Sequence, residues 1–284
     1  MLRCMPEGHT IHRYARLHRE TLGGRQVEAS SPQGRFAEGA SILDGRVLDD
    51  VEAVGKHLLY RFEGAPALHV HLGLFGRFVT YGSADGDVPD PTSGTRLRLR
   101  ADEGHDGSGG LRPAVEVRLA GPTACELLDT DDEQALRARL GPDPLDEHAE
   151  PSAFAGALSR RRVPIGQALL DQRVIAGVGN VFRAEALFIE GIDPATASRG
   201  LSADEVAALW HTLRRMLQEG ERRGRIVTVE TSERPDELAT DDARYVYRRE
   251  GLPCRRCQTP VISWQLGGRR VYACPHCQPA RATT

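Results

Sequence analysis

The chain has 284 residues, of which 40% are hydrophobic and 27% charged, and its formal net charge at pH 7 is −3. This length and apolar content exclude a disordered chain and suffice for two packed domains. No apolar run approaches the roughly 18 to 20 residues that a membrane span needs, and the first residues lack the apolar core of a secretory signal, so we expect a cytoplasmic protein that contacts no membrane.

The charge is unevenly distributed along the chain. Residues 81–150 carry 7 basic and 16 acidic side chains, whereas residues 244–284 carry 8 basic and 1 acidic. The net charge by itself does not indicate a nucleic-acid-binding protein, but this distribution predicts that the C-terminal forty-odd residues bind anions.

The first half of the chain predicts a helix followed by strands. Residues 9–22 place Ile11, Tyr14, Ala15, His18 and Leu22 at helical spacing. Strand-like segments with β-branched or alternating apolar residues follow at 26–29, 46–54, 57–62, 67–72, 96–100 and 114–119. We therefore expect residues 1–140 to form a mostly antiparallel β domain with one leading helix.

The second half predicts helices. Residues 141–152 contain three prolines among acidic residues and resemble an interdomain linker. Ser202 and Glu205 form a capping box at the start of a helix, followed by a single apolar stripe of Val206, Leu209, Trp210, Leu213, Met216 and Leu217. We expect an α+β protein with a helical domain over 153–243 and a separate β element over 244–284.

Four of the six cysteines form the pattern C-x2-C-x16-C-x2-C, at Cys254, Cys257, Cys274 and Cys277. Two such pairs joined by a hairpin place four thiolates around one tetrahedral zinc ion, and they leave no coordination position for water, which predicts a structural metal. Between the pairs we expect a turn of Gly267, Gly268, Arg269 and Arg270. Its two arginines can bind a phosphate or simply form a solvated surface.

The segment GVGN at 177–180 precedes a helical run at 181–188. Asn180 is a candidate N-cap of that helix. Alternatively, the backbone donors around Gly179 and the amide of Asn180 hold a phosphate at the helix N-terminus. The residues alone leave both interpretations open.

Lys56 is the only lysine in the chain, and Asn180 is the only asparagine. Gly55 and Lys56 lie between two predicted strands, where a hairpin would place the lysine at its tip. His69 and His71 share one face of a strand, but no third metal ligand has convincing spacing, so core or hydrogen-bonding roles are favoured for them.

The segment Met5, Pro6, Glu7 and Gly8 allows a specific chemistry. The amine of an N-terminal proline is secondary, so it can attack an aldehyde-level carbon and form a charged iminium, while a neighbouring carboxylate transfers protons. An internal segment of this sequence indicates only a turn.

Together these residues resemble the formamidopyrimidine-DNA glycosylase/endonuclease VIII family over essentially the whole chain. MPEG at 5–8 is similar to the opening of that family, Lys56 to its hairpin lysine, residues 172–188 to its helix-two-turn-helix, and residues 246–278 to its zinc finger. Arg269 lies five residues before the third cysteine, where the family has a phosphate-binding arginine.

The resemblance implies an N-terminal β-sandwich and a C-terminal helix-two-turn-helix domain with a zinc-finger hairpin. It implies a bacterial cytoplasmic enzyme of base excision repair, a monomer that binds damaged DNA and one structural Zn²⁺ and needs no organic cofactor. The damaged nucleotide would be flipped out, Pro6 would attack its sugar, Glu7 would assist ring opening, and β,δ-elimination would follow. The resemblance further implies DNA contacts at Lys56, Gly179, Asn180, Arg269 and Arg270, and a plug of Leu74 and Phe75 in the vacated base position.

The opening and the Leu74–Phe75 turn are closer to the endonuclease VIII branch, which prefers oxidised pyrimidines. Residues 1–4 depart from the family because they would block the amine of Pro6, so we expect the working protein to begin at Pro6, after initiation at Met5 and removal of that methionine. Two alternatives remain: a non-catalytic zinc-ribbon nucleic-acid-binding protein on the same scaffold, and an enzyme that uses Lys56 as its Schiff-base residue.

Overall fold

The computed structural model describes residues 6–82, 86–105, 108–229, 239 and 242–281. Its contacts divide these residues into two units. Unit 1 contains Pro6 and Ile11–Ala138, and unit 2 contains Glu7–Thr10 and the residues from Arg139 onward. The expected blocking segment, residues 1–4, and Met5 lie outside the described residues.

Unit 1 is built on an eight-stranded antiparallel sheet of order β10-β4-β3-β2-β1-β6-β9-β5. Its strands are β1 (Arg25–Ser30), β2 (Arg46–Val54), β3 (His57–Phe62), β4 (Ala67–His71), β5 (Arg77–Gly82), β6 (Thr95–Ala101), β9 (Val115–Ala120) and β10 (Ala124–Leu128). A separate two-stranded hairpin joins β7 (Gly104–His105) to β8 (Leu111–Arg112). All six predicted strands are present, and the sequence analysis missed β5, β10 and the short pair.

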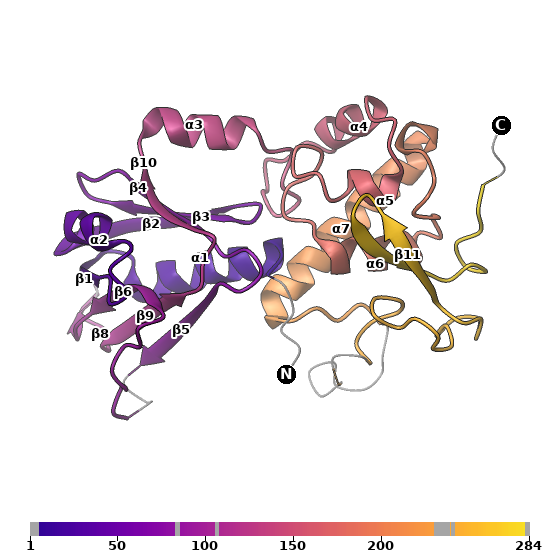
Figure 1. Cartoon of the computed structure of the whole chain (residues 1–284). Coiled ribbons are helices and arrows are strands. Elements are labelled where there is room, and N and C mark those ends of the chain that lie inside the picture. Colours follow the sequence, from indigo (N-terminus) through magenta and orange to yellow (C-terminus); the bar gives the residue numbers. More distant parts are fainter. Residues whose placement is uncertain (1–5, 83–85, 106–107, 230–238, 240–241, 282–284) are drawn as a thin grey trace. The chain divides into compact units, whose positions relative to one another are not determined.

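The sheet folds into two layers because β1 changes partner midway. Its first half pairs with β2 through Val27 and the two residues before it, and its second half pairs with β6 through Ala29 and its neighbours. Figure 1 shows β2, β3, β4 and β10 as one layer and β5, β6 and β9 as the other. Buried side chains from both layers and from α1 (Gly8–Leu22) form one core. The expected stripe of α1 is confirmed, since Ile11, Ala15, His18 and Leu22 are buried and Tyr14 is half-buried against the same core.

Two further helices, α2 (Ala37–Leu43) and α3 (Thr130–Ala138), were not predicted. Helix α2 has only seven residues, too few for a helical period to emerge. Helix α3 buries a single apolar side chain, Leu136, so its sequence carries no apolar stripe.

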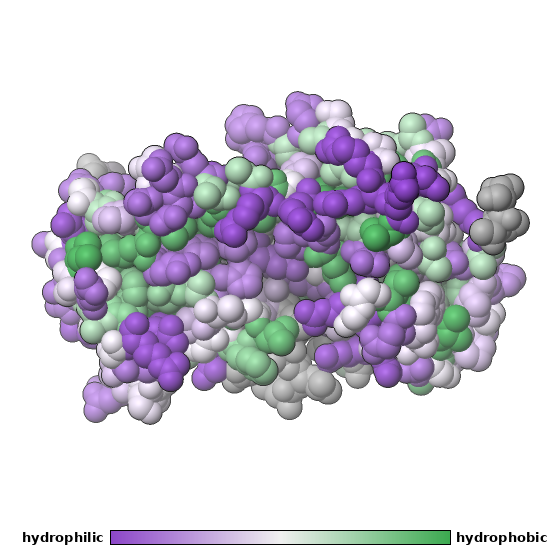
Figure 2. All heavy atoms as spheres, turned by 45° about the horizontal axis from the view of Figure 1, so that its top comes forward, coloured by the Kyte–Doolittle hydropathy of each residue, from purple (hydrophilic) through white to green (hydrophobic). Residues whose placement is uncertain are grey.

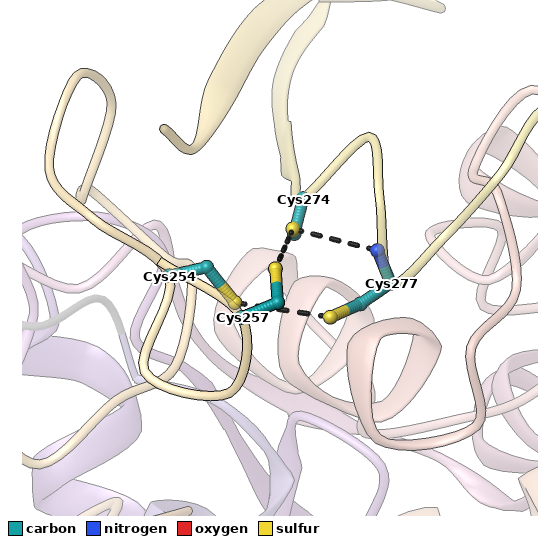
Figure 3. A group of neighbouring side chains, drawn as sticks. All are labelled: Cys254, Cys257, Cys274 and Cys277. Atoms are coloured by element: carbon teal, nitrogen blue, oxygen red, sulfur yellow. Dashed lines mark hydrogen bonds between the residues drawn. The ribbon is translucent and has the colours of Figure 1, made fainter. Parts of the chain in front are cut away.

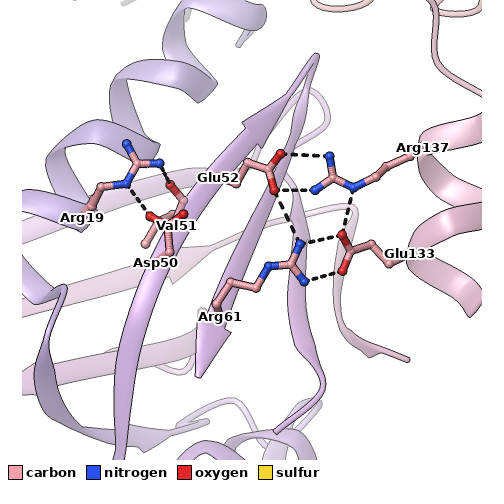
Figure 4. Close-up of polar contacts among 7 residues, drawn as sticks. All are labelled: Arg19, Asp50, Val51, Glu52, Arg61, Glu133 and Arg137. Atoms are coloured by element: carbon pink, nitrogen blue, oxygen red, sulfur yellow. Dashed lines mark hydrogen bonds and ion pairs between the residues drawn. The ribbon is translucent and has the colours of Figure 1, made fainter. Parts of the chain in front are cut away.

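Ion pairs attach α3 to the sheet (Figure 4). Glu133 of α3 accepts hydrogen bonds from Arg61 of β3, and Arg137 of α3 donates to Glu52 of β2 and, at 2.8 Å, to Glu133. The hydrogen bond from Arg61, followed by that from Arg137, lowers the pKa of Glu133 to about 2. Charged side chains therefore hold α3 where apolar packing is sparse.

Unit 2 is helical and ends in a hairpin. Its elements are α4 (Pro151–Ser159), α5 (Ile165–Ala168), α6 (Asn180–Ile189), the 3-10 helix η2 (Ser198–Gly200), α7 (Ala203–Arg223), β11 (Ile262–Leu266) and β12 (Arg269–Ala273). The expected capping box is confirmed, because Glu205 N–H donates to Ser202 Oγ and Ser202 N–H donates to Glu205. The predicted apolar stripe of α7 is buried throughout. The expected α+β fold, with strands first and helices second, is confirmed.

The C-terminal hairpin does not form a core of its own. Tyr245, Val246, Cys254 and Cys274 belong to the same buried cluster as the apolar residues of α6 and α7. The segment expected to be a separate β element thus shares its core with the helices, because the hairpin is too small to bury its apolar side chains alone.

On the face drawn in Figure 2, hydrophilic side chains predominate and hydrophobic ones form scattered patches. Within the described residues, every helix is too short or too polar to cross a bilayer. Leu74 and Phe75, in the turn between β4 and β5, are among the exposed large apolar side chains, at 48% and 73%.

Replacement of Glu133 by glutamine should lower the free energy of unfolding at pH 7 by about 1–2 kcal/mol, because two arginines lose a charged acceptor while remaining about one-third exposed and screened. A carboxyl whose pKa is lowered on folding stabilises the protein above its unfolded pKa, and this contribution is lost as pH falls through its folded pKa. The difference between wild type and variant should thus be constant above about pH 5 and shrink toward pH 2. Chemical denaturation across pH measures it, with the exposed Glu38→Gln as control; an equal loss at pH 3 and pH 7 would contradict the ion-pair explanation.

Candidate functional site

The carboxylate of Glu7 caps the N-terminus of α6. Glu7 is 1% exposed, and its two oxygens accept hydrogen bonds from the N–H groups of Gly179 at 2.9 Å, Val181 at 2.9 Å and Phe182 at 3.4 Å. These donors belong to the turn and first residues of the helix, where the helix dipole also favours a negative charge. Residue 7 is therefore fixed to a helix that lies 172 residues away in sequence.

Two glycines permit this approach. A Cβ atom on Gly179 would lie 2.4 Å from Cδ of Glu7, and one on Gly8 would lie 2.9 Å from Cα of Gly177. Gly177 has a φ of 83° and donates its N–H to the side chain of Gln172, which in turn donates to the carbonyl of Val178. The turn before α6 is thus shaped by glycine and by Gln172 so that the carboxylate can enter.

The capping interpretation of Asn180 was wrong. Gly179 occupies the N-cap position without a side-chain cap, and Asn180 is the first residue of α6. The expectation that the backbone donors of this turn are open to a phosphate also fails for Gly179, Val181 and Phe182, because Glu7 accepts their hydrogen bonds. A residue distant in sequence supplies the cap that local sequence assigned to Asn180.

Arg183 orients the side chain of Asn180. Arg183 is fully buried, and burial lowers its pKa to about 10. Its guanidinium donates to Oδ1 of Asn180, to the carbonyl of Arg270 at 2.7 Å and to the carbonyl of Gly166 at 2.9 Å. Asn180 itself donates from Nδ2 to the carbonyl of Arg270 at 3.2 Å. The start of α6 and the hairpin are therefore joined through one arginine.

Glu185 makes a second buried carboxylate cluster on α6, which the sequence analysis missed. It is fully buried and accepts hydrogen bonds from the N–H groups of Tyr245 at 2.7 Å, Val246 at 2.9 Å and Tyr247 at 2.8 Å, as well as from the hydroxyl of Thr228. Arg183 and Glu185 are charged residues in an otherwise apolar helix. This feature of the sequence could have indicated that both side chains have buried polar partners.

The four cysteines meet in unit 2 and could bind a metal ion (Figure 3). Their sulfur atoms all lie within 4.8 Å of one another, with Cys254 and Cys277 at 3.9 Å and Cys257 and Cys274 at 3.4 Å. Four sulfurs at the zinc–thiolate bond length in a tetrahedron are about 3.8 Å apart. The cluster thus has the size and the donor atoms that such an ion requires.

The arginines of the hairpin stand slightly outside the turn that was expected to hold them. Gly267 and Gly268, both with positive φ, make the turn, and Arg269 and Arg270 open β12. Both arginines are exposed, and Arg270 forms an ion pair with Glu250 at 3.0 Å. Their backbones are fixed by pairing with Leu266 and Gln265.

The remaining candidate residues lie in unit 1. Pro6 is half-buried and precedes the capping residue Glu7. Lys56 is half-buried in the two-residue turn between β2 and β3, which Gly55 enters with a φ of 60°. The structure therefore brings together Glu7, Gly179, Asn180 and the carbonyl of Arg270 within unit 2, and it places Pro6, Lys56, Leu74 and Phe75 in unit 1.

Replacement of Gly179 by alanine should lower the free energy of unfolding by at least about 2 kcal/mol, because the added methyl group displaces a buried carboxylate from its three donors. Gly200→Ala is the matched control, since its Cβ would meet no atom within 4 Å. It should change stability by less than about 0.5 kcal/mol. Thermal and denaturant unfolding of both variants measures this, and equal stabilities would mean that the cap contributes little.

Comparison with known proteins identifies the family. The family model described as the formamidopyrimidine-DNA glycosylase N-terminal domain matches residues 5–109, and that of the H2TH domain matches residues 140–231. Endonuclease 8 1 of Mycobacterium tuberculosis is 45% identical over 279 residues, which cover 96% of this chain and 100% of that protein. Formamidopyrimidine-DNA glycosylase of Thermus thermophilus is 36% identical over 284 residues, covering 96% and 97%.

Solved structures share the fold. A Lactococcus lactis FPG mutant, in complex with DNA containing Fapy-dG, superposes with a TM-score of 0.76 over 97% of this chain and 100% of that one, at 22% identity. The same fold occurs in a Lactococcus lactis Fpg bound to DNA with an abasic site, with a TM-score of 0.75. With relatives of this identity matching along nearly its whole length, the chain belongs to the formamidopyrimidine-DNA glycosylase/endonuclease VIII family.

Proposed function

We propose that the protein is a bifunctional DNA glycosylase and abasic-site lyase that excises oxidised bases in base excision repair. The observation that carries this proposal is the buried carboxylate of Glu7, which directly follows Pro6 and is fixed by three N–H donors of the turn before α6. This contact joins the two family motifs, residues 5–8 and 177–180. The family membership and the names of the relatives support the same activity.

The chemistry begins with the nitrogen of Pro6 as the chain's first residue. A secondary amine attacks the anomeric carbon of a flipped nucleotide, the bond to the base breaks, and the base leaves with a proton. The resulting iminium acidifies the neighbouring sugar carbon, so loss of that proton expels the 3′ phosphate and a second elimination expels the 5′ phosphate. Glu7 moves protons during sugar ring opening, and its fixed position keeps the carboxylate beside the amine.

Phosphate contacts hold the DNA around this centre. Lys56, Asn180 and Arg269 supply them, with Gly179 and Arg270 beside them. An amide NH₂ group has two N–H donors, of which Asn180 gives one to Arg270, so the second can serve a phosphate. Leu74 and Phe75, both exposed, fill the position that the flipped base vacates.

We infer that the metal is one zinc ion held by Cys254, Cys257, Cys274 and Cys277. Four thiolates fill a tetrahedral coordination sphere, so zinc supplies rigidity and no reactive water. Because β12 ends next to Cys274, that rigidity extends to Arg269 and Arg270 at its start.

In this proposal the preferred lesions are oxidised pyrimidines. The protein works in the bacterial cytoplasm, because the genome is there. The higher identity to a relative named endonuclease 8 than to the formamidopyrimidine-DNA glycosylase relative supports the pyrimidine assignment. The non-catalytic alternative is not favoured, because the motif residues at 5–8 are retained along with those of the DNA-binding domain.

Borohydride trapping on an abasic-site duplex tests the nucleophile. A protein that begins at Pro6 should form the covalent complex, whereas a protein that retains residues 1–5 should give only background, because the lone pair of an amide nitrogen is delocalised into the carbonyl and cannot make the attack. Mass spectrometry verifies both N-termini, and undamaged duplex is the control.

The same assay compares different lesions and distinguishes Pro6 from Lys56 as the nucleophile. Strands with thymine glycol or dihydrouracil should be cut in preference to strands with 8-oxoguanine opposite cytosine. Efficient trapping by the extended protein, lost in Lys56→Gln, would make Lys56 the nucleophile, and failure of every form to trap or cut would restore the non-catalytic alternative.

Elemental analysis should find one zinc per chain. Cys257→Ser with Cys277→Ser should lose the metal and at least about tenfold in duplex affinity, since the hairpin arginines lose their rigid support. Cys125→Ser, which removes a half-buried thiol in unit 1, should keep both. Active protein without zinc, or full affinity in the double variant, would refute this assignment.

A further inference from the structure

Three histidines gather on one face of unit 1. His57 opens β3, next to Lys56, and its register partner on β4 is His71. His57 Nδ1 lies 2.9 Å from His69 Nε2, and the other nitrogen of His69, Nδ1, lies 3.0 Å from Oε1 of Glu126 on β10. A chain of hydrogen bonds therefore runs across three strands, from Glu126 through His69 to His57.

This group is not arranged as a metal site. Within the part of the chain that the structure describes, the four cysteines are the one set of three or more His, Cys, Asp or Glu donors close enough to share an ion. Two ring nitrogens 2.9 Å apart share a proton, and a nitrogen that bonds through a proton is not ligating a metal. The hydrogen-bonding role that the sequence favoured is thus confirmed for His69, whose partners are His57 and Glu126.

The direction of these hydrogen bonds follows from the carboxylate at one end, which can only accept. A carboxylate only accepts, so Nδ1 of His69 carries the proton that bonds to Glu126. Nε2 of a neutral His69 is then an acceptor, and Nδ1 of His57 must donate to it. With Nδ1 protonated, Nε2 of His57 becomes the atom at which the network gains or loses a further proton.

The surrounding charges direct that proton to His57. His69 is 5% exposed and enclosed between its two partners, whereas His57 is half-buried. Burial, followed by the Coulombic effects of His69 and Lys56, lowers the pKa of His71, so its surroundings disfavour a proton there. On β2, the register partner of His57 is Val54. Further along this face, Glu52 and Arg61 form ion pairs with Arg137 and Glu133 of α3.

Two further groups act on the charge of His57. The positive charge of Lys56 opposes a charge on His57, and the carboxylate of Glu126 favours it through His69.

We propose that Glu126, His69 and His57 form a relay that holds a proton on His57 when DNA binds, so that His57 and Lys56 together contact the phosphate backbone. The inference rests on the proposed function, because it needs Lys56 to lie beside a phosphate. In this proposal His57 adds a positive charge next to Lys56 at the β2–β3 hairpin.

Binding should then be coupled to proton uptake. In the free protein Lys56 disfavours the second proton on His57, and a bound phosphate reverses that balance. A proton taken up on binding makes affinity rise as pH falls through the range in which His57 titrates, and the gain disappears above that range.

The test measures the affinity of the full chain beginning at Pro6 for a duplex with a tetrahydrofuran abasic-site analogue, which cannot be cleaved at the sugar carbon. Fluorescence anisotropy at constant ionic strength from about pH 6 to about pH 8.5 covers the histidine range. As the pH falls between these limits, the affinity of the wild type should rise about threefold to tenfold more than the affinity of His57→Gln. Glu126→Gln should lie between them, because its side chain is 55% exposed and its charge is partly screened.

Two controls remove an equivalent group elsewhere in unit 1. Glu63→Gln removes an exposed carboxylate just after β3, and His105→Gln removes an exposed histidine on β7; both should retain the wild-type pH dependence. As a measurement independent of the variants, nitrogen-detected NMR of histidine-labelled protein should find a proton on Nδ1 of both His69 and His57.

The outcomes are distinguishable. Equal pH dependence in wild type and His57→Gln, or in wild type and Glu126→Gln, would overturn the relay while leaving the glycosylase proposal intact. NMR showing His69 protonated on Nε2 would also overturn it. A wild type that neither prefers the abasic duplex nor traps on an abasic site would overturn the proposed function itself.

Discussion

The hydrogen bonds between the Glu7 carboxylate and the N-terminus of α6 are the constraint on which the candidate site depends. A charge that is 1% exposed is costly unless donors replace its lost hydration, and here three N–H groups and the helix dipole do so. Since the carboxylate cannot move without losing them, the position of Glu7 within unit 2 is fixed. This contact excludes a side chain at Gly179, and the close approach of the backbone at Gly177 excludes one at Gly8. The carboxylate proposed to transfer protons thus takes its position from the turn before α6, at residues 177–180.

Helix α6 serves as the scaffold for the rest of unit 2. Its N-terminus holds Glu7, Arg183 on its first turns binds the carbonyl of Arg270, and Glu185 takes three N–H groups from the segment that leads into the hairpin. Buried charges of this kind contribute little to stability when compared with apolar side chains, but they have strict directional requirements. Their role here is to fix where the hairpin and its arginines lie relative to Asn180.

Unit 1 uses polar contacts in a similar way on one face of its sheet. The ion pairs of Glu52, Arg61, Glu133 and Arg137 attach α3, and the histidine chain ends beside the hairpin that carries Lys56. The core behind this face is formed by apolar residues from both layers and from α1. Packing thus determines the fold of the unit, while the polar network positions the charged groups that the proposed function needs.

The sequence by itself determined the features that depend on local pattern: the apolar stripes of α1 and α7, the capping box at Ser202, most of the strands, and the cysteine spacing. These could be predicted because periodicity, caps and ligand spacing are short-range properties. The family could also be predicted, because its motifs are short and occur in a fixed order. Only the tertiary structure decided that Glu7 caps α6 in place of Asn180, that Glu185 holds the segment before the hairpin, and that His57 completes the histidine chain. Each of these contacts joins residues far apart in sequence, and a hydrogen-bond partner is selected by which donors and acceptors folding brings within about 3 Å, a distance that no local pattern encodes.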